Sequence, residues 1–206
     1  DDVTRSGQRN NTFLMVSFVD LYGGFSGEET SLSQRNWSVN ATVLDGDLLQ
    51  NDATTLTGES LMSHASRSDN SYHVVSFVGN TDPSVMLDGF QVINGNANDF
   101  DISTVEDIEL MNYAGGGIVA VNANPKIKNS VFRYNSAYYG GGIYAGMYMD
   151  GWIGKYSETI LNCIFEKNHA AYDGSAIHGE AVQVYLINST VLDHSYSPGY
   201  IGSAIR

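Results

Sequence analysis

The chain has little cysteine, little positive charge and no long apolar run. Its single cysteine, Cys163, excludes an internal disulfide bond. Lys and Arg together number 10 against 23 Asp and Glu, which gives a formal net charge of -13 at pH 7. Because so acidic a chain repels the phosphates of nucleic acid, we exclude nucleic acid as a partner. We also expect no transmembrane segment, since no stretch reaches the roughly 18 apolar residues that a membrane span needs.

Glycine, by contrast, recurs in clusters that close on isoleucine. The pattern appears in "YAGGGIVAV" (113–121), "YNSAYYGGGIYAG" (134–146), "YDGSAIHGE" (172–180) and "YIGSAIR" (200–206). The closing residues, which lie 25, 34 and 28 apart, are Ile118, Ile143, Ile177 and Ile205. Because glycine permits positive φ and close backbone approach, a recurring cluster predicts a recurring tight bend. We expect each bend to lead into a strand whose isoleucine packs in one inward column.

A second motif keeps step with the glycine clusters. It appears as "NSVFRYN" (129–135), "NCIFEKN" (162–168) and, more weakly, "NSTVLDH" (188–194). Phe132 and Phe165 occupy the same position in the first two copies of the motif. We therefore expect their side chains to pack in one inward-facing column. The leading residues, Asn129, Asn162 and Asn188, predict a corner ladder, because Asn tolerates left-handed φ and stacked amides hydrogen-bond to one another. Cys163 stands where other repeats place serine, so we expect a packed small residue rather than a nucleophile.

The apolar segments between these motifs are short and rich in β-branched and aromatic residues, which favours strands. Only residues 103–113 leave a choice between a helical turn or two and a loop. Short strands on a repeat of about 25 residues predict an all-β solenoid, a parallel β-helix of about eight coils. We expect a single domain over residues 1–206 that is a fragment of a longer chain. Residues 146–156 are predicted to form a loop inserted in one coil.

The repeats carry a family resemblance. "FRYN" and "FEKN", paired with "GGGI" and "GSAI", resemble the FxxN and GGAI repeats of the polymorphic outer-membrane proteins, a family of chlamydial autotransporter passengers. Residues 19–47, 70–75 and 87–98 are similar to secreted bacterial right-handed β-helix proteins. The resemblance implies a right-handed parallel β-helix with pectin-lyase-like architecture. It also implies a location outside the cell or on the outer cell surface, as an adhesin or structural passenger.

Three functions are open at this point. The first is a non-catalytic surface module for adhesion or structure, whose partner is a surface glycan or protein. Aromatic residues crowd positions 138–156, and the candidate ligand contacts there are Tyr144, Trp152 and Tyr156. The second is a subunit that binds copies of itself end to end in an extracellular filament or sheath, because the last repeat delivers Ile205 with no capping segment after it.

The third open function is a polysaccharide lyase or glycoside hydrolase of the β-helix type. A lyase needs a base beside carboxylates that hold calcium, and an inverting hydrolase needs two carboxylates that face each other. "HGE" (178–180) is the nearest fragment of such a site, so we predict no catalytic residue. Calcium is the one cofactor with candidate ligands, which occur in two acidic turns. These are Asp45, Asp47, Asp99 and Asp101.

Overall fold

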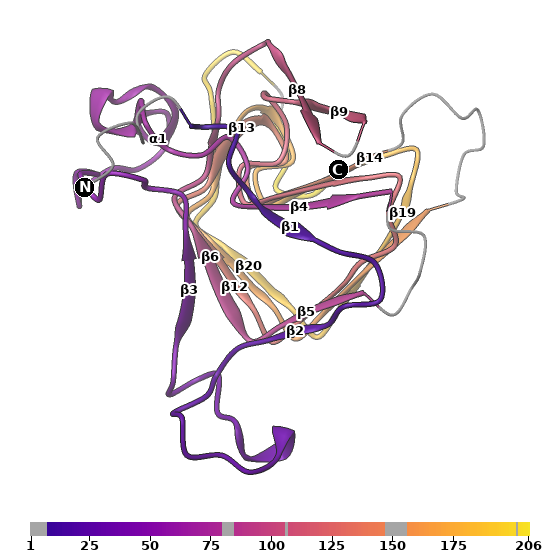
Figure 1. The fold of residues 1–206 in the computed structure, drawn as a ribbon. Coiled ribbons are helices and arrows are strands. Elements are labelled where there is room, and N and C mark those ends of the chain that lie inside the picture. The colour runs from indigo at the N-terminus through magenta and orange to yellow at the C-terminus, as the bar shows by residue number, and fades with distance from the viewer. Residues whose placement is uncertain (1–7, 80–84, 106, 147–155, 201) are drawn as a thin grey trace.

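The computed structural model describes residues 8–79, 85–105, 107–146, 156–200 and 202–206. Most of this chain winds through short strands that stack, coil on coil, into four parallel sheets, named A to D here. Viewed along the helix axis, sheets A, B and C form the sides of a triangle, and the short sheet D lies at the corner between C and A (Figure 1).

Each sheet takes one strand from each successive coil. Sheet A consists of β1 (Phe13–Met15), β4 (Val75–Val78), β10 (Ile118–Val121), β14 (Ile143–Gly146) and β18 (Ile177–Glu180). Sheet B consists of β2 (Leu21–Tyr22), β5 (Met86–Asp88), β11 (Lys126–Lys128), β15 (Ser157–Leu161) and β19 (Gln183–Ile187). Sheet C consists of β3 (Thr42–Asp45), β6 (Phe90–Ile93), β12 (Val131–Arg133), β16 (Ile164–Glu166) and β20 (Thr190–Leu192). Sheet D consists of β7 (Asn96–Ala97), β13 (Ser136–Tyr139), β17 (His169–Asp173) and β21 (Ser195–Tyr196).

Neighbouring strands within all four sheets pair in parallel, which is the arrangement of a parallel β-helix. The predicted fold class is therefore confirmed, and the right-handed winding stays a prediction. The number of coils was predicted wrongly, because the largest sheets hold five strands in the described chain. Excursions lengthen the first coils: 62 residues separate Phe13 from the equivalent Val75, and 43 separate Val75 from Ile118. The excursions contain η2 (Leu32–Gln34), α1 (Ser60–Ser63) and η3 (Ala65–Arg67).

The segment 103–113 is neither helical nor a plain loop. It forms an antiparallel hairpin of β8 (Ile102–Val105) and β9 (Ile108–Met111), which packs on the outer face of sheet A. Leu110 of the hairpin is buried with Val119, Val121 and Tyr144 of that face. The outer face of sheet A is apolar at these positions, so its burial under the hairpin is favourable. Sequence periodicity over so short a segment did not separate a hairpin from a helical turn.

The inward columns lie where the repeat spacing places them. Ile118, Ile143 and Ile177 are fully buried and pair in register across sheet A. Ile205 bridges to Ile177 but is 44% exposed, because it lies at the end of the stack. In sheet C the rings of Phe132 and Phe165 stack with centroids 4.8 Å apart and an interplanar angle of 9°. The equivalent residues of successive coils therefore build one continuous core.

Two asparagine ladders hold the corners of the coils. The predicted one contains Asn129, Asn162 and Asn188, all with positive φ. Asn162 Nδ2 donates to Asn129 Oδ1 at 2.7 Å, and Asn188 Nδ2 donates to Asn162 Oδ1 at 3.3 Å. The second, which was not predicted, uses the last residue of the FxxN pattern: Asn135 and Asn168 are fully buried, and each Nδ2 donates to a backbone carbonyl of the preceding coil. The first ladder thus links side-chain amides from coil to coil, whereas the second satisfies backbone carbonyls inside the corner.

Candidate functional site

Six aromatic side chains form an unbroken run of ring contacts along the corner between sheets D and A. We name this run the aromatic strip, and its members are Phe100, Tyr113, Tyr138, Tyr139, Tyr172 and Tyr200. The ring centroids of Phe100 and Tyr138 lie 4.4 Å apart, those of Tyr138 and Tyr172 lie 5.1 Å apart, and those of Tyr172 and Tyr200 lie 4.6 Å apart. The strip thus extends from the second coil to the fifth.

The repeat itself creates the strip. Every glycine cluster begins with a tyrosine one to two residues before the first glycine: Tyr113, Tyr139, Tyr172 and Tyr200. Because coils stack with about 4.8 Å between equivalent residues, these rings come into contact from coil to coil. The sequence carried this signal in the tyrosine just before the glycines of each cluster, but the prediction used only the glycines and isoleucines. Phe100 and Tyr200, at the two ends, are 58% and 51% exposed.

Two clefts flank the strip. The α1 cleft has a volume of about 630 Å³ and lies between Tyr138, Tyr172 and Tyr200 on one side and Glu59 and Met62 of the α1 region on the other. The hairpin cleft has a volume of about 510 Å³ and lies between the β8–β9 hairpin and β18. Both volumes fall in the range of small-molecule sites.

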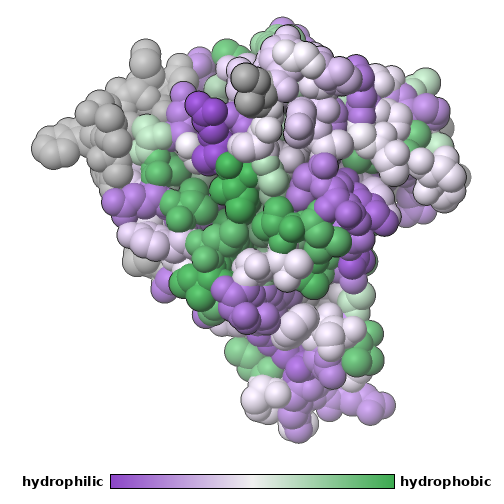
Figure 2. Space-filling view, turned by 180° about the vertical axis from the view of Figure 1, so that it is seen from behind, coloured by the Kyte–Doolittle hydropathy of each residue, from purple (hydrophilic) through white to green (hydrophobic). Residues whose placement is uncertain are grey.

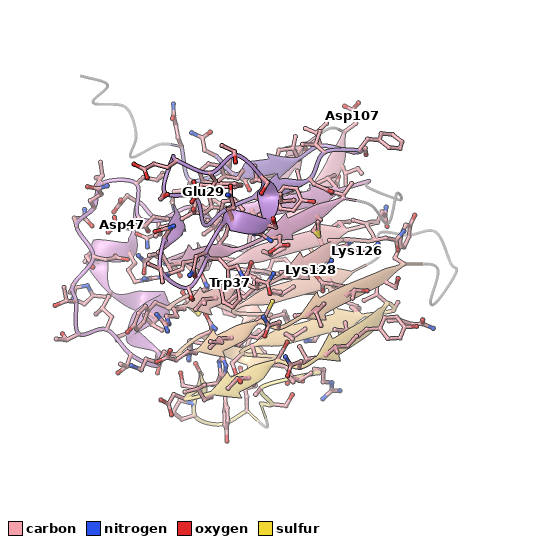
Figure 3. All side chains as sticks on the ribbon, turned by 90° about the horizontal axis from the view of Figure 1, so that it is seen from below. Glu29, Trp37, Asp47, Asp107, Lys126 and Lys128 are labelled. Carbon is pink, nitrogen blue, oxygen red and sulfur yellow. The ribbon has the colours of Figure 1, made fainter. Side chains whose placement is uncertain are left out.

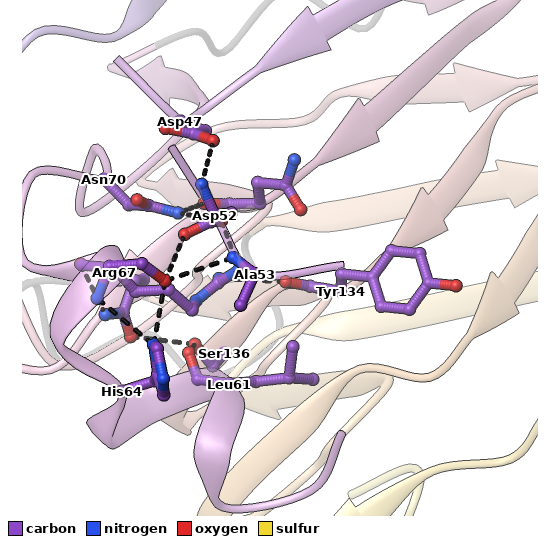
Figure 4. Close-up of polar contacts among 12 residues, drawn as sticks. Asp47, Asp52, Ala53, Leu61, His64, Arg67, Asn70, Tyr134 and Ser136 are labelled. Atoms are coloured by element: carbon purple, nitrogen blue, oxygen red, sulfur yellow. Dashed lines mark hydrogen bonds and ion pairs between the residues drawn. The ribbon is translucent and has the colours of Figure 1, made fainter. Parts of the chain in front are cut away.

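A buried arginine fixes the α1 wall of the first cleft (Figure 4). Arg67 Nη1 lies 2.8 Å from Asp52 Oδ2, and Arg67 Nη2 donates to the carbonyls of Gly95 and Tyr134, each at 3.0 Å. Ser136 Oγ of β13 donates to the Leu61 carbonyl of α1 at 2.8 Å. Burial lowers the pKa of Arg67, and the carboxylate of Asp52 offsets part of that effect. The excursion is therefore anchored to the coils by charge-assisted hydrogen bonds.

The hairpin cleft combines aromatic rings with one carboxylate. Tyr144 Oη donates to Glu180 Oε2 at 2.6 Å, and the Tyr144 ring stacks on His178 with an interplanar angle of 8°. Burial, followed by the hydrogen bond to Glu180, raises the pKa of Tyr144, so the phenol keeps its proton. Burial lowers the pKa of His178, so its imidazole is neutral at pH 7. At the rim, Arg206 Nη1 lies 3.0 Å from Asp173 Oδ2.

Two of the three predicted ligand contacts, Tyr144 and Tyr156, are buried. Tyr144 is 4% exposed because the hairpin covers its strand, although it does line the hairpin cleft. Tyr156 is 3% exposed. Trp152 and most of the predicted loop 146–156 lie outside the described residues. The premise of surface exposure was therefore wrong for Tyr144 and Tyr156, because the sequence did not reveal which outer faces are covered.

The four candidate calcium ligands do not converge. Asp45 Oδ1 accepts from Asp47 N at 3.0 Å and from Asn94 Nδ2 at 2.9 Å. Asp99 Oδ2 accepts from Tyr72 Oη at 2.9 Å, and Asp99 Oδ1 accepts from Asp101 N at 3.2 Å. Among the described residues, no group of three or more metal-ligating side chains comes together. The carboxylates of Asp45, Asp47 and Asp99 each accept from a backbone N–H in a turn, a role common for Asp.

Other polar groups lie away from the strip. Lys126 and Lys128 alternate with the buried Ile127 and therefore project from the outer face of sheet B, on a different side from the strip (Figure 3). Cys163 is buried, and burial raises the pKa of its thiol to about 12, so it is an unreactive packed residue. In the part of the chain that is described, no helix is both long and apolar enough to cross a bilayer.

Comparison with known proteins gives one match. Residues 162–180 match the repeat of the Chlamydia polymorphic membrane protein, and this span runs from the "NCIF" corner through β16 and β17 to β18. The matched span contains Phe165, Asn168 and Ile177, which belong to "FEKN" and "GSAI", whereas "FRYN" and "GGGI", on which the resemblance was also based, lie outside it. No curated protein and no solved structure matches the chain. The likeness of the amino-terminal half to secreted β-helix proteins stays a prediction.

Proposed function

We propose that the protein is a non-catalytic module of the cell surface that adheres to a surface glycan or protein through the aromatic strip. The repeat shared with a Chlamydia membrane protein supports a surface location. The single observation that carries the adhesive role is the strip itself, whose rings contact one another over four coils. Tyrosine rings present large contact areas and lose little conformational entropy on binding. A catalytic role has less support, because the described lining of the hairpin cleft contains a single carboxylate, that of Glu180.

Beads coated with the protein test this proposal by their adhesion to cultured epithelial cells. We expect Tyr172→Ser and Tyr200→Ser each to reduce bead retention about tenfold, because each removes a ring that the partner contacts. Tyr200 is half exposed, so its substitution leaves the core intact. The matched control is Tyr185→Ser, which removes an equally exposed tyrosine from sheet B. Unchanged retention with both strip variants, at unchanged thermal stability, would sink the proposal.

End-to-end assembly is a second candidate function, supported by apolar side chains at the end of the stack that β18 to β21 form. Figure 2 views this end, where apolar residues form a continuous patch. The inward side chains of the last coil, among them Val184, Leu186 and Val191, are only partly buried there. A second copy of the chain stacked on this end would bury them. In negative-stain electron microscopy at micromolar concentration, filaments that Leu186→Lys abolishes are expected, whereas separate rods of the wild type would refute assembly.

A further inference from the structure

The hairpin cleft presents two kinds of group to solvent at once. Tyr113 and Tyr139 line it with half-buried rings, whose centroids lie 6.4 Å apart and whose planes are inclined by 66°. Glu180 is exposed at one side, and the Arg206 side chain, 66% exposed, lies at the rim. Apolar ring faces beside a hydrogen-bond acceptor and a donor fit a ligand that is apolar on its faces and polar at its edges.

The polar groups are held in place before any ligand binds. Glu180 Oε2 already accepts from Tyr144 Oη at 2.6 Å, which orients the carboxylate and leaves its other oxygen to accept further hydrogen bonds. Tyr144 is fixed in turn by its stack on His178, and His178 contacts Tyr139 with ring centroids 5.2 Å apart. Arg206 keeps guanidinium donors beyond the one paired with Asp173. A ligand thus gains these contacts with little loss of side-chain entropy.

The charges around the cleft select among possible ligands. Glu180 and Asp173, together with the net charge of -13, disfavour an anionic sugar or an acidic peptide. The guanidinium of Arg206, in the same lining, disfavours a cationic ligand. Hydroxyl groups both donate and accept, so a polyol edge satisfies a carboxylate and a guanidinium together.

We infer that the hairpin cleft binds a neutral saccharide, with one sugar ring packed on Tyr139 and adjacent hydroxyls hydrogen-bonded to Glu180 and Arg206. The inference rests on the proposed adhesive function and names its ligand class. The strip continues from Tyr139 to Tyr172, whose ring centroids lie 5.3 Å apart, so further sugar units would extend toward the α1 cleft. The single described carboxylate in the cleft makes this a binding site rather than a site of glycosidic hydrolysis.

A glycan array that carries neutral, sialylated and sulfated saccharides is the test, followed by titration calorimetry with the strongest neutral oligosaccharide. We expect binding to neutral saccharides, and a loss of affinity of about tenfold or more for Glu180→Ala, because the charge-assisted hydrogen bonds are lost. Glu28→Ala is the matched control, since Glu28 is an exposed glutamate in the first excursion. Saturation of the tyrosine resonances is expected to transfer to the sugar C–H protons in the wild type, and to weaken in Tyr139→Leu.

Three outcomes would overturn the inference: no binding of any neutral saccharide at millimolar concentration, preferential binding of the acidic saccharides, or equal affinity of the Glu180→Ala variant and the wild type. The proposed adhesive function is judged separately by bead retention. Retention that depends on Tyr172 and Tyr200 without saccharide binding would reject the sugar site and leave adhesion to a protein partner standing.

Discussion

Phe132→Ala is expected to lower the free energy of unfolding by about 3–5 kcal/mol, the usual cost of removing a buried aromatic ring. Phe132 is fully buried, its ring stacks on Phe165, and its strand pairs with Val92 in the coil above and Phe165 in the coil below. Each coil of a solenoid contacts only its neighbours, so no distant element moves in to fill the cavity. The variant therefore weakens the link between the second and fourth coils.

Urea denaturation followed by circular dichroism measures this effect. The matched control is Val131→Ala on the same strand, whose half-buried side chain faces outward, and we expect it to cost less than about 1 kcal/mol. We also expect the Phe132→Ala variant to unfold in a broader transition, because coils on either side of the weakened contact then separate. A loss below about 1 kcal/mol would show that the phenylalanine column is not a principal source of stability.

Glu158→Gln is expected to change how stability depends on pH. Glu158 lies in β15 and faces inward, as Ile160 does, and neither carboxylate oxygen has a hydrogen-bond partner among the described residues. Burial raises the pKa of this carboxyl from 4.5 to about 8. Glu158 therefore stays protonated in the folded protein up to about pH 8, whereas in the unfolded chain it ionises near pH 4.5.

The sign of the effect follows from these two pKa values. Below pH 4.5 the carboxyl of Glu158 is neutral in both the folded and the unfolded state, so its ionisation does not reduce the free energy of unfolding. As the pH rises from 4.5 to about 8, ionisation of Glu158 in the unfolded state lowers the free energy of unfolding by about 1.4 kcal/mol per pH unit. Above pH 8 the free energy of unfolding falls no further on account of this group. A glutamine is uncharged throughout, so the Glu158→Gln variant should gain on the wild type by several kcal/mol, to order of magnitude, between pH 5 and pH 8.

Urea denaturation of both proteins at pH 5, 6.5 and 8 measures the difference directly, and other titrating groups cancel in the comparison. Glu28→Gln serves as the control for the substitution itself, because Glu28 is an exposed glutamate. A difference between Glu158→Gln and wild type that is constant across the three pH values would contradict burial of an ionisable Glu158.

The repeats made much of the core predictable. Ile118, Phe132 and Asn129 each have an equivalent residue in the next coil. The repeat spacing therefore predicted the isoleucine column, the phenylalanine column and the asparagine ladder together. The excursions were not predictable in the same way, because residues 24–41 and 46–70 occur once each and follow no period. They are the reason why the chain makes fewer coils than its length suggested.

The candidate site depends on features that single-sequence patterns do not record. Whether Tyr144 is exposed is decided by the β8–β9 hairpin, which lies more than thirty positions earlier in the sequence and packs on it by tertiary contact. The cleft wall at α1 likewise depends on Arg67, whose partners Gly95 and Tyr134 lie in later coils. The tyrosine column was readable, since a tyrosine precedes every glycine cluster, but its exposure required the fold.

Tyrosine footprinting of the protein bound to epithelial cells tests the central claim, that the aromatic strip is the contact surface, most directly. Hydroxyl-radical labelling is read by mass spectrometry for the free and the bound protein. The account predicts protection of Tyr138, Tyr172 and Tyr200 on binding, with Tyr185 of sheet B, 50% exposed, labelled equally in both states. Equal labelling of the strip in both states, or protection confined to Tyr185, would contradict it.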